Sequence, residues 1–86
     1  VNSFSMLVYP VPANSYALVE INARKTVKLD LRIVDVAGRL EHIQKLEIVQ
    51  GINRIPLDVS KYSTGTHFIQ LFHQGKKAAY FKLQIQ

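Results

Sequence analysis

The chain has 86 residues, a hydrophobic fraction of 48%, a formal net charge of +5 and no cysteine. This length suits one small domain, and the hydrophobic fraction predicts a packed core rather than a disordered chain. The lack of cysteine excludes a disulfide, a thiolate metal site and a cysteine nucleophile. No apolar run approaches the ~18 residues that a membrane-spanning helix needs.

The positive charge favours anionic partners, but its distribution along the chain argues against a nucleic-acid site. The Lys and Arg residues are scattered, and their two adjacent pairs, at 24–25 and 76–77, fall in expected turns. The aromatic residues do not alternate with basic ones as a stacking platform would require. We therefore interpret the basic residues as solvated loop charges and expect no nucleic-acid partner.

The first expected strand covers residues 4–8, where every second residue is apolar. Pro10 and Pro12 end this run, because proline fixes φ and cannot donate a hydrogen bond to a sheet. A second strand is expected over Tyr16–Ala23, where apolar residues again occupy alternate positions.

The clearest alternation lies in residues 27–33, where four apolar residues alternate with three charged ones. This pattern predicts a strand with one face in the core and the other in water. A hairpin turn is expected next, since Gly38 tolerates positive φ and Asp35 can accept backbone hydrogen bonds. Residues 40–49 fit a helical spacing as well as a strand, and the short distance between the flanking glycine turns favours a strand.

Three further strands are expected over residues 52–57, 67–72 and 78–85. Pro56 places the first of them at a sheet edge or at the last rung of its strand. Seven short strands with turn residues between them predict an all-β fold, an antiparallel β-sandwich.

The sequence contains no recognisable catalytic motif. His42, His67 and His73 are far apart and lack a metal-ligand spacing, so we interpret them as exposed or half-buried strand residues. Asp35 and Asp58 are expected to cap turns rather than to act as catalytic acids. We expect no catalytic residue, no metal and no cofactor.

Five short motifs resemble, in order, those of the C-terminal sorting domains of Bacteroidota proteins exported by the type IX secretion system (type A, Por secretion family). The motifs are Y-P-N-P-A at residues 9–13, D-x-x-G-R at 35–39, G-x-N at 51–53, L-D-x-S…G-x-Y at 57–67 and K-x-x-I/V/L at 82–85. Val11 stands where the family usually has Asn, and His67 stands where it usually has Tyr.

The resemblance implies a seven-stranded immunoglobulin-like antiparallel β-sandwich. Residues 1–86 would be a single C-terminal sorting domain that belongs to a larger secreted protein. Such a domain is a non-catalytic secretion signal that directs an N-terminal passenger through the outer-membrane translocon. The implied partners are the type IX translocon, its outer-membrane shuttle protein, a sortase-like peptidase that removes the domain, and the covalently linked passenger. The implied location is the periplasm in transit, then the outer-membrane surface or the extracellular space.

The resemblance also directs attention to particular residues. The last strand is the expected recognition element for the translocon or shuttle, through Lys82, Leu83, Ile85 and Gln86, because a free edge strand can pair with a partner. Deleting the last five residues is expected to abolish export while leaving most of the core. The motif residues expected to shape turns are Tyr9, Pro10, Pro12, Asp35, Gly38, Arg39, Gly51, Asn53, Asp58 and Gly65.

Three alternatives are left open. The domain could be an accessory immunoglobulin- or fibronectin-like binding module for an anionic polysaccharide or a protein partner. Its positive charge would then attract an anionic ligand. It could be a purely structural spacer. The isolated domain could also form a homodimer through its exposed sheet edges.

Overall fold

The computed structural model describes residues 4–10 and 13–86, in which the chain forms β-strands and no helix. The strands are β1 (Phe4–Tyr9), β2 (Tyr16–Ala23), β3 (Val27–Asp35), β4 (Leu40–Ile48), β5 (Gly51–Asp58), β6 (Gly65–His73) and β7 (Lys76–Ile85). In these ranges no helix is long and apolar enough to cross a membrane. The seven strands expected from the sequence are thus confirmed.

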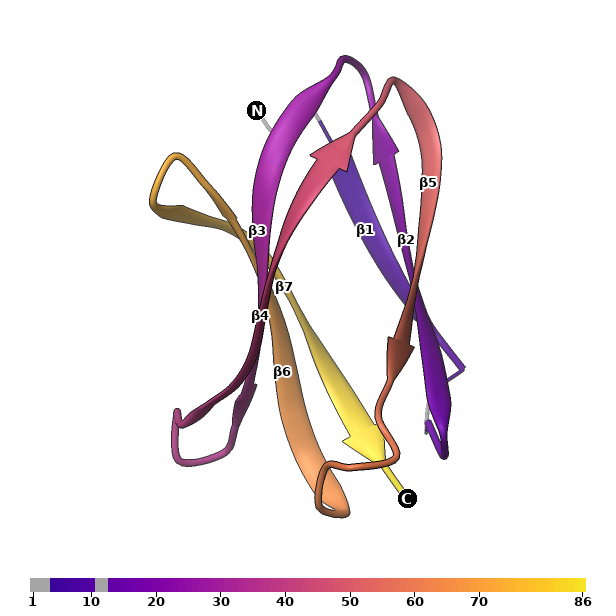
Figure 1. The fold of residues 1–86 in the computed structure, drawn as a ribbon, viewed down its shortest axis with the longest axis vertical. Coiled ribbons are helices and arrows are strands. Elements are labelled where there is room, and N and C mark those ends of the chain that lie inside the picture. The colour runs from indigo at the N-terminus through magenta and orange to yellow at the C-terminus, as the bar shows by residue number, and fades with distance from the viewer. Residues whose placement is uncertain (1–3, 11–12) are drawn as a thin grey trace.

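Two antiparallel sheets pack face to face (Figure 1). One has the order β1-β2-β5 and the other the order β4-β3-β6-β7. The chain passes from one sheet to the other after β2, after β4 and after β5, whereas β3–β4 and β6–β7 are hairpins within one sheet. This architecture confirms the predicted immunoglobulin-like sandwich.

The core lies between the sheets and follows the alternation of each strand. In β3, Leu29, Leu31 and Ile33 are buried, and the charged residues between them face away from the other sheet. β2 and β6 contribute buried side chains in the same way, including Ile21 and Ile69. Period-two patterning therefore assigns one face of each strand to the core.

β4 shows why residues 40–49 fitted two patterns. Leu40 and Ile43 are about half exposed, and of the helically spaced residues only Leu46 is buried. A register shift opposite Ile33 and Val34 interrupts the alternation of β4, so apolar residues occur on both of its faces.

Pro56 lies in β5, which pairs with β2 and forms an edge of its sheet. The expectation of an edge position is therefore confirmed. The missing N–H of proline is tolerated there because an edge strand has no second neighbouring strand that needs a donor.

Candidate functional site

Three of the expected recognition residues lie on β7, an edge strand of the four-stranded sheet, and Gln86 directly follows it. Leu83 is fully buried opposite His67, and Ile85 is 2% exposed opposite Gly65. The Lys82 and Gln86 side chains are exposed. In the folded domain, a partner can therefore reach the side chains of Lys82 and Gln86 but not those of Leu83 and Ile85.

The carboxy-terminal end of β7 is held by a second segment of the chain. Ala13 forms a parallel bridge with Ile85: its N–H donates to the Gln84 carbonyl at 2.8 Å, and its carbonyl accepts from the Gln86 N–H at 2.8 Å. Ala13 itself is completely buried. The expectation that a five-residue deletion would leave most of the core needs correction, because this deletion removes two core side chains and the bridge.

The turn between β3 and β4 is organised by Asp35. One oxygen of its carboxylate accepts hydrogen bonds from the N–H groups of Ala37 and Arg39, each at 2.9 Å, and the other accepts from Arg39 Nε at 3.0 Å. Gly38 has φ +82°, a conformation that residues with a Cβ rarely adopt. The hydrogen bond from the Arg39 amide, together with those from the Arg39 side chain and Ala37, lowers the pKa of Asp35.

Asn53 organises the connection that leads from β4 into β5. Its side-chain oxygen accepts from the Val49 N–H at 3.1 Å, and its amide donates to the carbonyls of Val49 and Gly51. The same amide donates to the Ile21 carbonyl on β2 at 3.2 Å. Asn53 therefore fixes the turn and attaches it to the neighbouring strand.

Asp58 begins the connection between β5 and β6. Its carboxylate accepts from the Ser60 N–H at 3.0 Å and from the Ser60 hydroxyl at 2.6 Å. These hydrogen bonds lower the pKa of Asp58, and the bond from the Ser60 hydroxyl has the largest effect. Val59 is buried and donates its N–H to the Ser15 carbonyl at 2.9 Å. The connection ends at Gly65, with φ +123°.

Tyr9 lies at the end of β1, before Pro10, which is exposed. The Tyr9 hydroxyl donates to Glu20 Oε1 at 3.1 Å, and Arg54 Nε donates to the same oxygen at 3.2 Å. This group joins β1, β2 and β5 on the outer face of the three-stranded sheet. Pro12, which belongs to the same motif, lies outside the described residues, as does Val11.

Most of these turns lie at one end of the sandwich. The end of β1, the start of β2, the β3–β4 turn and the β5–β6 connection lie at the end where β7 finishes (Figure 1). The turn at Gly51 is at the opposite end, near the start of β1. The turns at Gly38 and Gly65 thus lie at the end of the sandwich where β7 finishes, whereas the turn at Gly51 lies at the other end.

The interpretation of His67 as an exposed or half-buried residue is wrong. Its side chain is 1% exposed. Nδ1 lies 2.5 Å from Glu41 Oε1, and Nε2 donates to the Ser63 carbonyl at 2.8 Å. Because the carbonyl only accepts, Nε2 carries a proton. His67 therefore connects Glu41 on β4 with the backbone of the β5–β6 connection.

Tyr62 packs beside this pair, with its ring centre 6.0 Å from that of His67. Burial raises the pKa of the Tyr62 hydroxyl, and the nearby carboxylates of Glu41 and Asp58 add to the effect. In the described ranges no three His, Asp or Glu side chains come together as a metal site would require.

The interpretation of the basic residues as scattered loop charges is also wrong for one face. Strand pairing places Arg32, Lys77 and Lys82 on the outer face of the four-stranded sheet together with Phe68, Phe72 and Tyr80. We call these six residues the basic–aromatic patch. Their sequence positions are far apart, but the alternation of β3, β6 and the second half of β7 assigns all of them except Lys77 to the non-core face. Lys77 precedes a register shift between β6 and β7 and lies opposite Phe72. The alternation could have indicated the shared face, but not which residues are neighbours on it.

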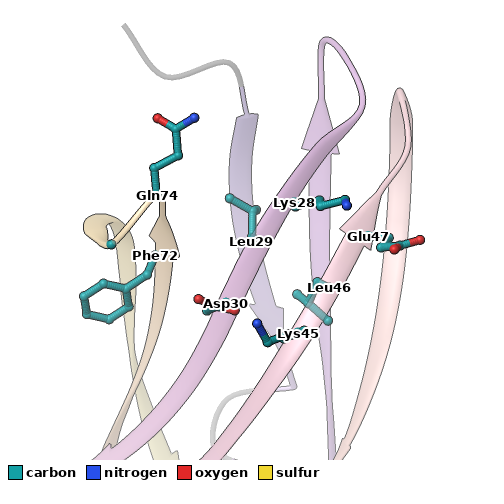
Figure 2. Close-up of a pocket in the computed structure, with 9 residues that line it drawn as sticks. Lys28, Leu29, Asp30, Lys45, Leu46, Glu47, Phe72 and Gln74 are labelled. Atoms are coloured by element: carbon teal, nitrogen blue, oxygen red, sulfur yellow. The ribbon is translucent and has the colours of Figure 1, made fainter.

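A shallow groove of about 390 Å³ adjoins the patch at Phe72 and lies between β3, β4 and the β6–β7 turn. Figure 2 shows Asp30 and Lys45 close together on neighbouring strands, with Phe72 and Gln74 at one side of the groove. Positive and negative side chains alternate across it, because Lys28 lies opposite Glu47 and Asp30 opposite Lys45. The groove therefore has no excess of one charge.

The lowered pKa values of Asp35 and Asp58 predict an acid-dependent loss of stability. A carboxylate whose pKa is lower in the folded state stabilises the fold above its unfolded-state pKa, and this contribution disappears as the pH falls through the folded-state value. The melting temperature is thus expected to fall between about pH 5 and pH 2. Thermal unfolding followed by circular dichroism measures it. The Asp35→Asn/Asp58→Asn variant should show a smaller fall, and an equal fall in both proteins would contradict the assignment.

Comparison with known proteins identifies a matching family and similar folds. A sequence profile for the family described as "Secretion system C-terminal sorting domain" matches residues 7–86. No curated protein matches the sequence. Among solved structures, the fold is similar to part of dimeric latent PorU from Porphyromonas gingivalis, with a TM-score of 0.73 and 17% identity over 95% of this chain.

A weaker likeness, with a TM-score of 0.54 and 12% identity over 95% of this chain, is to a β-glucosidase from Listeria innocua in complex with glucose. The chain covers 9% of the PorU chain and 16% of the β-glucosidase chain. At these identities the structural matches establish the fold alone. The family profile covers nearly the whole chain, and the matched range includes all five motifs from Tyr9 onwards. The chain therefore belongs to the secretion system C-terminal sorting domain family.

Proposed function

We propose that this domain is a non-catalytic type IX secretion signal, which directs a covalently linked N-terminal passenger through the outer-membrane translocon with the help of a shuttle protein. The observation that carries the proposal is the family match over residues 7–86. In this proposal residues 1–86 are the C-terminal module of a larger secreted protein. The exported passenger reaches the outer-membrane surface or the extracellular space after transit through the periplasm.

The shape of the domain supports this function. β1 begins at one end of the sandwich, and β7 finishes at the other (Figure 1). The longest dimension of the domain is 35 Å. A passenger attached before β1 would therefore lie away from the turns and the end of β7, which stay accessible to a partner. Recognition through Lys82 and Gln86, whose side chains are exposed, fits this arrangement.

Later steps belong to the same proposal. A sortase-like peptidase would remove the domain before β1 and attach the passenger to the cell surface. β1, β4, β5 and β7 are edge strands, so isolated copies of the domain could also pair through these edges into a homodimer.

A reporter export experiment tests the proposed function. A periplasm-targeted fluorescent protein is fused to residues 1–86 and expressed in a bacterium with a working type IX system and in its translocon-deficient twin. We expect the reporter in the medium or on the surface of the first strain only. The same reporter without the domain is the control and should stay in the periplasm of both strains.

An intact fusion that stays in the periplasm of both strains would contradict the proposal. It would favour the second candidate, a binding module for an anionic ligand, for which the cations of the basic–aromatic patch are the supporting observation.

A further inference from the structure

We propose that the basic–aromatic patch is the surface through which this domain docks onto an acidic surface of a folded partner protein during export. This inference rests on the proposed function and names the partner chemistry for it. The patch is a second recognition surface beside the terminal strand, and Lys82 belongs to both. The argument depends on how the patch is built, on its charge and on its exposure.

Strand register builds the patch from three strands. Lys82 lies opposite Phe68, Tyr80 opposite Gln70, and Lys77 opposite Phe72. On β3, Arg32 lies opposite Gln70. Side chains directly opposite one another in a sheet are close neighbours on one face. The patch is therefore continuous across β3, β6 and β7.

The cations and aromatic rings of the patch contact one another. The Arg32 guanidinium carbon lies 4.2 Å from the centre of the Phe72 ring, and Lys77 Nζ lies 5.7 Å from that of Tyr80. The Phe68 and Tyr80 rings are 6.5 Å apart. Such contacts orient the charged groups without neutralising them.

The patch keeps a net positive charge. In the described part of the chain, the Lys and Arg side chains that form ion pairs are Arg39 and Arg54, and neither belongs to the patch. The Asp30 carboxylate borders the patch, because Asp30 lies opposite Phe72 on one side and opposite Lys45 on the other. Asp35 lies at the margin, where Arg39 and the turn amides hold its carboxylate. No acid within the patch offsets its three cations.

Arg32 gives the patch a specific requirement for an acceptor. Its Nε is buried and has no hydrogen-bond partner among the described residues. The guanidinium also carries two amino groups, through which it can bind a carboxylate with charge-assisted hydrogen bonds. An aspartate or glutamate of a partner supplies such an acceptor.

Exposure and shape favour a protein as the partner. Tyr80 is 65% exposed, and a hollow of about 300 Å³ lies beside it, lined by Val34, Phe68 and Lys77 among others. Tyr and Arg are the residues enriched in the energetically dominant centres of protein interfaces. A flat sheet face with one shallow hollow matches a protein surface that carries a projecting side chain.

Charge reversal tests the inference in the reporter export experiment. The Lys77→Glu/Lys82→Glu fusion changes two exposed patch cations, and the Arg24→Glu/Lys25→Glu fusion makes the same net change in the exposed connection between β2 and β3. We expect export of the patch variant to fall at least about tenfold, because like charges facing one another across an interface are strongly unfavourable. The control variant should be exported like the unchanged fusion.

The outcomes separate this inference from the function on which it rests. If the unchanged fusion is not exported, the proposed function fails. If that fusion and both variants are exported equally, the docking inference fails and the function stands. Melting temperatures of both purified variants must match that of the unchanged domain. A patch variant that is exported normally but no longer binds alginate would also overturn the inference, in favour of an anionic glycan as the ligand.

Discussion

Deletion of residues 82–86 is expected to unfold the domain. The deleted segment contains Leu83, which is 0% exposed, and Ile85, which is 2% exposed. It also removes the acceptor and donor that hold Ala13 against the end of β7. The remaining part of β7 would leave the inner faces of β6 and of the opposite sheet exposed to water.

The expected loss is comparable with the total stability of a domain of this size. Removing a large buried aliphatic side chain costs about 2–5 kcal/mol. Each of the two lost backbone hydrogen bonds adds roughly 1 kcal/mol. Small domains have total stabilities of about 5–15 kcal/mol, so the truncated chain should show no cooperative thermal transition by circular dichroism. A cooperative transition near that of the full domain would contradict this prediction.

The deletion therefore cannot by itself distinguish recognition from folding. The matched control is Lys82→Ser/Gln86→Ser, which changes two exposed side chains and keeps the buried ones. This variant should keep its melting temperature, since exposed substitutions usually change stability by less than about 0.5 kcal/mol. Lost export with an unchanged melting temperature would assign recognition to the exposed side chains of the terminal strand.

The strands and their core faces could be predicted from the sequence, because both follow from a local pattern. The alternation in residues 27–33 identifies β3 and its buried face without knowledge of any neighbour. The turns are equally local. Asp35 caps a turn whose donors lie within four residues of it, and Asn53 bonds mainly to residues within four positions.

The features that escaped prediction depend on pairing between distant strands. Phe68 and Lys82 become neighbours only through the register of β6 with β7, and Arg32 joins them only because β3 pairs with β6. The parallel bridge from Ala13 to Ile85 joins residues near the two ends of the chain. A single sequence contains no local pattern that specifies such pairs, so the patch and the bridge had to come from the structure.

His67 was misinterpreted for a related reason. Its position at the start of β6 places it on the core face, in line with Ile69 and Leu71, and this much the alternation could have shown. A buried histidine needs partners for both ring nitrogens. One partner, Glu41, comes from β4, next to the register shift in that strand, and a shift of this kind has no clear mark in the sequence.

Replacing His67 with alanine is expected to be the most destabilising single substitution at a polar position. The change empties a buried site between Tyr62 and the paired Leu83, and it leaves the Ser63 carbonyl and Glu41 without their shared partner. A cavity and the loss of both ring hydrogen bonds together should cost about 2–4 kcal/mol. For a domain of this length, that loss lowers the melting temperature by roughly 10–25 °C.

Two further variants separate packing from hydrogen bonding. His67→Phe fills most of the site but cannot donate to Ser63, so it should lose about 1–3 kcal/mol. Glu41→Gln retains a side chain that can hydrogen-bond Nδ1 and should cost less than either change at His67. His73→Ala, at a half-buried position on the same strand, is the matched control and should change the melting temperature little.

The relative stabilities of these variants test the described position of His67. If His67→Phe is as stable as the unchanged domain, the two hydrogen bonds contribute nothing and the ring serves only to fill space. If His67→Ala is also as stable, His67 does not occupy the buried position described. The expected melting temperature is lowest for His67→Ala, intermediate for His67→Phe and highest for Glu41→Gln. This order follows because the buried imidazole both fills the core and connects β4, β6 and the β5–β6 connection.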